Sequence, residues 1–208
     1  MSEQVLMPMI GTDSLENKER AQESLEKARL AHEKYLIGQR NNDLQEAIEH
    51  YVDAVKYDPT IPETYYRLAT LMWEQGQISV NTAIEQCKTA ISLAPLNKDA
   101  HLYTGYFMQL AQDFVSAEKE FKSAINMSRL NSGRPRMILS QSILQKINTQ
   151  NGTFKDYAGF LYYFLTGSIM LAWDRPTIKM FYKNISNDVS IFSYNTVGKF
   201  LEKFKMYD

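Results

Sequence analysis

Few side chains in this sequence are placed to do acid–base, nucleophilic or metal chemistry. His32, His50 and His101 lie far apart in the sequence, so each is interpreted as a surface or packing residue. The single cysteine, Cys87, cannot form an internal disulfide. We expect it to be a buried structural thiol, because reactive thiols need an exposed, electropositive setting. The sequence therefore predicts no catalytic residue, no metal site and no cofactor.

The sequence also lacks the short motifs of several enzyme classes. It contains no glycine-rich phosphate loop, no His-Glu-x-x-His zinc motif and no Gly-x-Ser-x-Gly nucleophile motif. Glu118 and Glu120 are interpreted as part of a solvated helix face, not as a catalytic pair. The 23 Lys and Arg residues nearly balance the 24 Asp and Glu residues, which does not indicate a nucleic-acid partner. We expect a protein that is not an enzyme.

Length and composition are those of a globular protein. The chain has 208 residues, of which 44% are hydrophobic and 23% are charged. Its first fourteen residues do not resemble a secretory signal, because Glu3 stands where a basic residue is expected and Pro8 and Gly11 interrupt the apolar run. We expect a cytoplasmic location, with the cytoplasmic face of a membrane as the alternative.

Three segments repeat one arrangement of small and bulky residues. The segments are EAIEHYVDAVKYDP, TAIEQCKTAISLAP and SAEKEFKSAINMSR, and their small-bulky-small positions are Ala47-Tyr51-Ala54, Ala83-Cys87-Ala90 and Ala117-Phe121-Ala124. Ala47 and Ala83 are 36 residues apart, whereas Ala83 and Ala117 are 34 apart. We assign the two extra residues to a turn near Gln77 to Asn81.

A second helix precedes each of the later two segments. Its residues follow the spacing 3, 1, 3, which places them on one helix face: Tyr65, Leu68, Ala69 and Met72, then His101, Thr104, Gly105 and Met108. The small residues Ala69 and Gly105 allow two helices to approach closely. Pro59 and Pro95 are expected to stop the preceding helices.

With these residues, the chain resembles the tetratricopeptide repeat family, whose unit is a helix–turn–helix of 34 residues. The resemblance covers about residues 28–131 and implies an all-α solenoid of three helix pairs. The first repeat departs from the family pattern at Lys34 and Tyr35, and the third has Arg129 in place of the terminal proline.

The flanking regions predict further helices. Asp13 and Glu16 form a capping box, which predicts one long helix over about residues 14–40. Pro135 is expected to begin a helix that caps the solenoid, and residues 150–153, Gln-Asn-Gly-Thr, are expected to form a break before the next helix. The predicted divisions are a disordered tail (1–13), an N-terminal helix plus three helix pairs (14–131), a capping helix and linker (132–150) and an aromatic-rich helical C-terminal unit (151–208).

The C-terminal part differs in charge and composition from the repeats. Residues 1–130 carry 13 basic and 19 acidic residues, whereas residues 131–208 carry 10 basic and 5 acidic residues. Residues 157–173 contain no charge over 17 residues, which is the lower length limit for a membrane-spanning helix. Two interpretations of this helix stay open. In the first, it contacts a membrane. In the second, it is a central helix buried by the apolar stripes that follow at residues 178–185 and 197–204.

In the repeat family, ligands usually lie in a concave groove lined by the first helix of each pair. Carried over, the groove would be lined by Arg29, His32, Gln39, Arg40, Tyr66, Thr70, Trp73, Asp99, Leu102, Tyr106 and Gln109, together with Leu36, Glu63, Glu74 and Leu110. Members that bind chaperones clamp a C-terminal carboxylate with Lys, Asn and Arg. Leu36, Tyr66 and Asp99 occupy the matching positions here, so only Arg29 and Arg40 could serve, and the clamp is expected to be absent.

The resemblance implies a chaperone-like scaffold or adaptor that binds a protein or peptide segment with apolar anchors. Tyr66, Trp73 and Tyr106 combine a large rigid ring with a polar group, as interface hot spots do. For the groove, the alternatives are that the chain's own C-terminal unit fills it, or that these aromatic residues pack between repeats. For the function, the alternative is a membrane-attached assembly factor or secretion-type chaperone with residues 157–173 as its membrane-contacting helix. The sequence does not indicate an oligomeric state.

Overall fold

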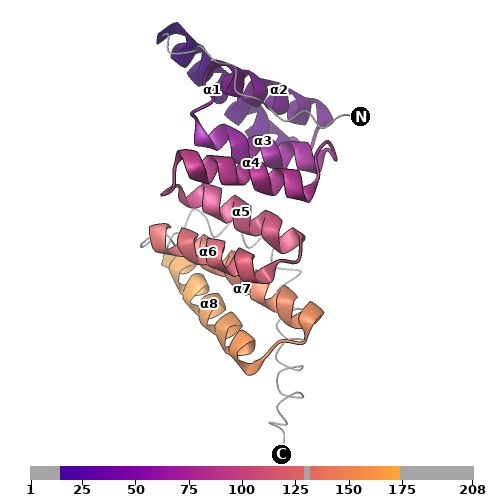
Figure 1. Ribbon diagram of the computed structural model, residues 1–208, viewed down its shortest axis with the longest axis vertical. Helices are drawn as coiled ribbons and strands as arrows, with labels where there is room; N and C mark the ends of the chain where they lie inside the picture. The colour runs from indigo at the N-terminus through magenta and orange to yellow at the C-terminus, as the bar shows by residue number, and fades with distance from the viewer. Residues whose placement is uncertain (1–14, 129–131, 174–208) are drawn as a thin grey trace, which may run out of the picture. The chain divides into compact units, whose positions relative to one another are not determined.

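The structure, a computed structural model, describes residues 15–128 and 132–173, which contain eight α-helices and no strand (Figure 1). The helices are α1 (Leu15–Gly38), α2 (Asn41–Tyr57), α3 (Pro62–Glu74), α4 (Val80–Leu93), α5 (Lys98–Leu110), α6 (Phe114–Ser128), α7 (Gly133–Gln150) and α8 (Phe154–Trp173). The all-α fold class predicted from the sequence is confirmed.

The chain divides into two compact units, Met1–Ala111 and Gln112–Asp208. The first unit contains α1 to α5 and the second contains α6 to α8. The helices of the third predicted pair, α5 and α6, therefore belong to different units. The predicted divisions at residues 131 and 150 stay predictions.

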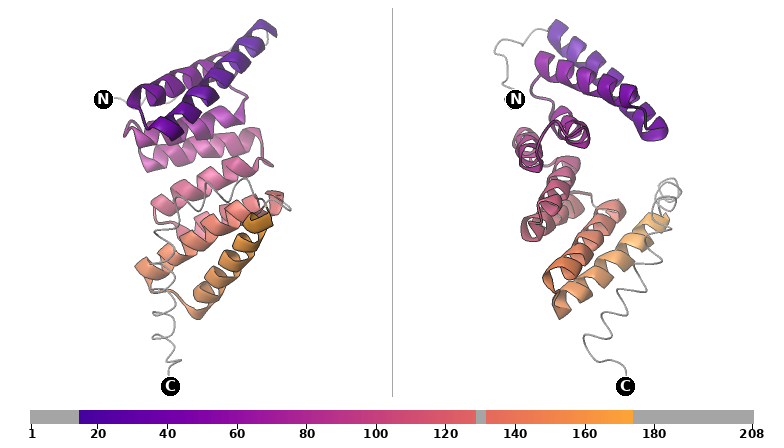
Figure 2. Two further views of the ribbon diagram at one scale, coloured as in Figure 1. Left: turned by 180° about the vertical axis from the view of Figure 1, so that it is seen from behind. Right: turned by 90° about the vertical axis from the view of Figure 1, so that its right-hand side faces the viewer.

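The long first helix was predicted over about residues 14–40 and is observed as α1. It lies against α2, as the views of Figure 2 show, and its alanine-rich face is buried through Ala21, Ala28 and Ala31. The helix ends at Gly38, and Gln39 follows in the left-handed region with a φ of 53°. Asp13 of the predicted capping box lies outside the described residues.

The repeated small and bulky positions form the core of the first unit. Ala47, Ala69 and Ala83 are completely buried, which is why neighbouring helices can approach closely. Tyr51 and Cys87 are also completely buried at the bulky positions. Burial of one such side chain contributes roughly 1.5–3 kcal/mol, so these layers are the main source of stability.

The two extra residues of the 36-residue spacing are found in the turn before α4. Residues 75–79 connect α3 to α4, whereas only residues 111–113 connect α5 to α6. Gly76 takes a φ of 70° in the longer turn, and the Ser79 side chain caps α4 by accepting the Thr82 N–H. The predicted position near Gln77 is confirmed.

In the second unit, α7 and α8 pack against each other. The predicted break at residues 150–153 is observed, since Asn151 ends α7 in the left-handed region. Thr153 and Asp156 then cap each other's backbone N–H at the start of α8. The Lys146 ammonium lies 2.7 Å from the Asp156 carboxylate and ties α7 to α8.

The uncharged segment forms most of α8. Tyr157, Phe160 and Gly167 are buried on one side, and the opposite side exposes Leu161, Tyr162, Leu165 and Ile169. Within the described ranges, no helix has the length and apolarity that crossing a bilayer requires. The stripes expected to cover this helix lie beyond residue 173, outside the described residues.

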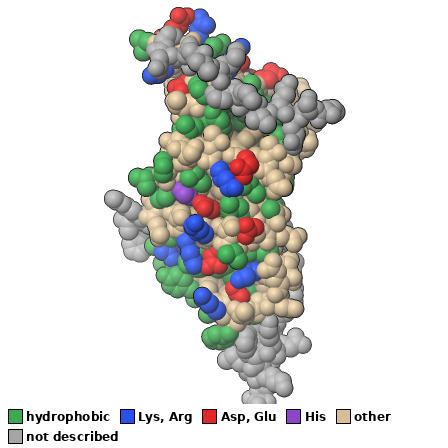
Figure 3. All heavy atoms as spheres, in the orientation of Figure 1, with side chains coloured by type: hydrophobic (Ala, Val, Ile, Leu, Met, Phe, Trp, Pro, Cys, Tyr) green, Lys and Arg blue, Asp and Glu red, His purple; other side chains and the backbone are tan. Residues whose placement is uncertain are grey.

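One face of the molecule carries charges of both signs. On the face drawn in Figure 3, Lys and Arg side chains lie among Asp and Glu side chains and hydrophobic ones. No patch of one sign dominates that face, in agreement with the near-neutral composition.

Candidate partner-binding surface

The predicted binding residues come from equivalent positions of three helices in the first unit. Arg29 on α1, Glu63 on α3 and Asp99 on α5 are separated by 34 and 36 residues, and Leu36, Thr70 and Tyr106 by the same steps. Within α3, Glu63, Tyr66, Thr70 and Trp73 follow one another at steps of three or four residues, which keeps them on one face of the helix. This face of α1, α3 and α5 is called the α1–α3–α5 surface below.

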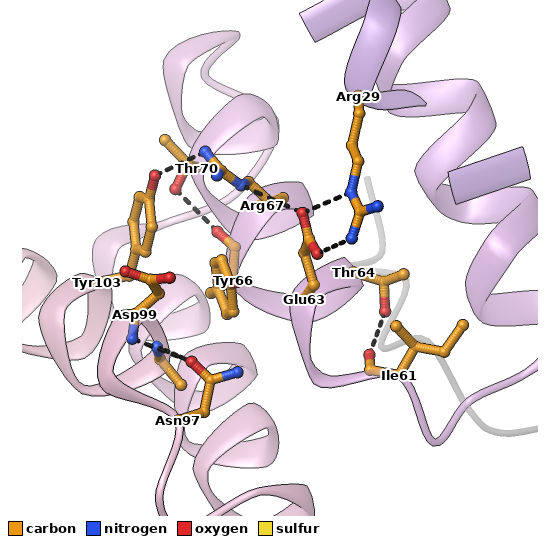
Figure 4. Close-up of polar contacts among 11 residues, drawn as sticks. Arg29, Ile61, Glu63, Thr64, Tyr66, Arg67, Thr70, Asn97, Asp99 and Tyr103 are labelled. Atoms are coloured by element: carbon orange, nitrogen blue, oxygen red, sulfur yellow. Dashed lines mark hydrogen bonds and ion pairs between the residues drawn. The ribbon is translucent and has the colours of Figure 1, made fainter. Parts of the chain in front are cut away.

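A chain of polar contacts joins the three helices (Figure 4). The Arg29 guanidinium donates two hydrogen bonds to the Glu63 carboxylate, of which the Nε–Oε1 bond is 3.1 Å. Arg67, one turn further along α3, has its Nε 3.8 Å from Glu63 Oε1 and donates from Nη1 to Tyr103 Oη at 2.9 Å. This chain therefore links α1, α3 and α5 in a fixed register.

Aromatic stacking reinforces the same contact. The rings of Tyr66 and Tyr103 stack with centroids 5.0 Å apart and an interplanar angle of 15°. The Arg67 guanidinium carbon lies 5.8 Å and 5.6 Å from these two ring centroids, within the range of a cation–π interaction. Tyr66 is only 3% exposed, and burial raises the pKa of its hydroxyl.

His32 lies beneath this polar chain. Its side chain is buried and meets the Tyr51 ring edge-on, with centroids 6.3 Å apart. Burial lowers the pKa of His32 to about 4, the positive charge of Arg67 adds to this effect, and the charge of Glu63 opposes it. His32 is therefore neutral at pH 7 and packs as part of the core.

A second cluster lies at the C-terminal end of α3. The Trp73 ring meets Tyr106 edge-on at 6.1 Å and Phe107 at 5.7 Å. Tyr35 of α1 lies near the Glu74 carboxylate. Burial raises the pKa of Glu74, and the nearby Tyr35 hydroxyl opposes that shift. Tyr106 is 36% exposed. Burial raises the pKa of the Tyr106 hydroxyl, and the nearby charge of Glu74 raises it further.

The structure distributes the predicted residues over three settings. Arg29 belongs to the polar chain, and Trp73 and Tyr106 form the second cluster. His32, Tyr66 and Leu102 are buried and support the surface from below. The others lie at or near the surface: Gln39 and Arg40 in the turn after α1, Thr70 bonded to the Tyr66 carbonyl at 2.8 Å, and Asp99 and Gln109 partly buried on α5.

Sequence reasoning missed two central members of this surface, Arg67 and Tyr103. A signal was present, because Arg67 follows Glu63 by four residues and Tyr103 follows Arg67 by 36 residues, one repeat spacing. Arg29, one of two residues considered for carboxylate binding, is already paired with Glu63. Cys87 is buried, and burial raises the pKa of its thiol to about 12, which confirms the structural role.

Comparisons with known proteins address the fold. A family model described as a TPR repeat matches residues 40–76. No curated protein matches the chain. The NMR structure of the first TPR domain of human RPAP3 is 20% identical, with a TM-score of 0.50, over 64% of this chain and 98% of that one.

Two further solved structures have lower scores. The first TPR of Spaghetti (RPAP3), bound to an HSP90 peptide, is 17% identical with a TM-score of 0.47, over 79% of this chain and 99% of that one. A crystal structure of MamA is 16% identical with a TM-score of 0.46, over 83% and 95%. The match over residues 40–76 identifies a tetratricopeptide repeat in that segment, and the likeness to the RPAP3 domain shows that the chain has the fold of a tetratricopeptide repeat domain.

Proposed function

We propose that the chain is a non-enzymatic interaction module that holds a segment of a partner protein on the α1–α3–α5 surface. The observation that carries the proposal is the pair Trp73 and Tyr106, an edge-on aromatic pair with the Tyr106 ring 36% exposed. Rigid rings with a polar group are the side chains that most often anchor protein interfaces.

The polar chain beside this pair supports a binding role. Arg29, Glu63 and Arg67 hold α1 and α3 together, and Arg67 also reaches Tyr103 on α5. Because the surface is braced before a partner arrives, little side-chain freedom is lost on binding, which favours affinity. The charges of Arg29, Arg67 and Glu63 are paired with one another, and His32 is neutral and buried. The surface is therefore suited to holding a segment and not to proton transfer.

The proposal is tested by selecting linear peptides from a display library against the full chain. We expect enriched peptides whose affinity falls about 10-fold with Tyr106→Ala, the loss typical of an interface anchor. Leu96→Ala is the matched control, because Leu96 is 83% exposed in the turn before α5, at the opposite end of that helix from Tyr106. Failure to enrich any peptide, or an equal loss with the control, would contradict the proposal.

A further inference from the structure

Glu74 is a carboxylate set among aromatic rings without a cation beside it. Tyr35 of α1 and Tyr106 of α5 lie within reach of its charge, and Trp73 precedes it on α3 and contacts Tyr106. Part of the Glu74 side chain is exposed at the surface, so a ligand can reach it. Across residues 15–128 and 132–173, no Lys or Arg forms an ion pair with this carboxylate.

The same helix shows what such a setting accommodates when a cation is present. Near the start of α3, the Glu63 carboxylate, the Tyr66 ring and the Tyr103 ring of α5 lie around the guanidinium of Arg67. Arg29 adds a second guanidinium to Glu63. Glu74, Trp73 and Tyr106 also offer one carboxylate and two rings, here edge-on instead of stacked, and without a guanidinium.

We infer that Glu74, Trp73 and Tyr106 form a recognition site for a cationic side chain, arginine or lysine, of the bound segment. This inference rests on the proposed function and names the chemistry of the partner. The carboxylate supplies the charge and the rings supply cation–π attraction, which is strongest for tryptophan. A guanidinium suits the site best, because it can bond a carboxylate and stack on a ring at once. Partial burial raises the pKa of Glu74 because it disfavours the charged carboxylate, and a bound cation would stabilise that charge.

The test uses the peptides selected against the full chain. We expect them to share an arginine or lysine at one position. For an arginine peptide, citrulline in place of arginine removes the charge and keeps the shape, and affinity should fall about 10-fold. With Glu74→Gln the same replacement should cost much less, because the two changes remove one interaction. Glu85→Gln on α4, whose carboxylate pairs with Lys88, is the matched control and should leave the full citrulline effect.

The outcomes separate this inference from the proposed function. Enriched peptides without a shared cation would overturn the cationic site and leave the binding role intact. A citrulline effect as large in Glu74→Gln as in the wild type would mean that the cation binds elsewhere on the chain, which also overturns the site. If no peptide is enriched, both the binding role and the cationic site fail.

Discussion

At the residue scale, His32 shows how the surface is supported from below. It is 7% exposed, packs edge-on against Tyr51 of α2, and faces Arg67 and Glu63 of α3. Protonation would place a positive charge in a buried site beside a guanidinium. The folded protein therefore keeps this imidazole neutral, with its pKa lowered to about 4 by burial and by Arg67.

This predicts a loss of stability in mild acid. Above pH 6.5 the imidazole is neutral in both states and has no effect. As the pH falls below 6.5, the unfolded chain binds a proton that the folded chain does not, so stability falls until about pH 4. Between pH 7 and pH 5 the loss should be about 1–2 kcal/mol.

Urea unfolding of the full chain at pH 7 and pH 5 measures this loss. His32→Gln, which carries no titrating ring, should lose less stability than the wild type over the same interval. A wild-type pH dependence in the variant would contradict the account of His32.

The sequence predicted candidate binding residues, but not how those residues pair. The resemblance to the repeat family placed Arg29, Tyr66 and Tyr106 on the first helices of the pairs. The contacts of Arg67 with Glu63 and Tyr103 depend on rotamers and on the distance between helices, which spacing does not specify. For the same reason, the sequence left open whether His32 and Tyr66 lie at the surface or pack in the interior, and the structure shows both buried.

At the element scale, the turn between α7 and α8 is specified by close packing. Asn151 takes the left-handed conformation, and Gly152 then passes directly over Ile147. A Cβ at Gly152 would lie 2.5 Å from Ile147 Cγ1 and 3.0 Å from its Cα. The backbone atom cannot move aside without shifting the end of α7.

Gly152→Ala should therefore destabilise the chain by about 1–3 kcal/mol, the usual cost of overpacking. Thermal unfolding of the full chain measures the effect. Gly159→Ala is the matched control, because a Cβ there meets only Ile143 Cδ1, at an ordinary 3.7 Å, inside α8. The control should be neutral or slightly stabilising, since alanine favours a helix over glycine. Equal melting temperatures for the two variants would contradict the packing argument.

Element boundaries were predicted well where local chemistry determines them. The break at Gly152 and the longer turn before α4 followed from glycine content and from the 36-residue spacing. The start of α8 was predicted at Tyr157 because the uncharged run begins there, but the cap made by Thr153 and Asp156 starts the helix at Phe154. The exposed side of α8 shows why its environment was not predicted: apolar composition does not say what covers a helix.

At the scale of the whole molecule, we propose that the α1–α3–α5 surface binds a segment of another protein and that the helices around it frame this surface. The repeat unit was predictable because its small and bulky positions recur at fixed spacing. The partner was not, because its identity depends on a complementary surface that this sequence does not contain.

The most direct test places an aromatic photo-crosslinking residue at position 106 of the full chain in cells, where it preserves the ring of Tyr106. The same residue at Lys88, exposed on α4, is the matched control. If the α1–α3–α5 surface binds a partner, we expect a distinct protein to be captured reproducibly from position 106 and not from position 88. Capture of only the chain's own residues 150–208, or the same protein captured from both positions, would contradict it.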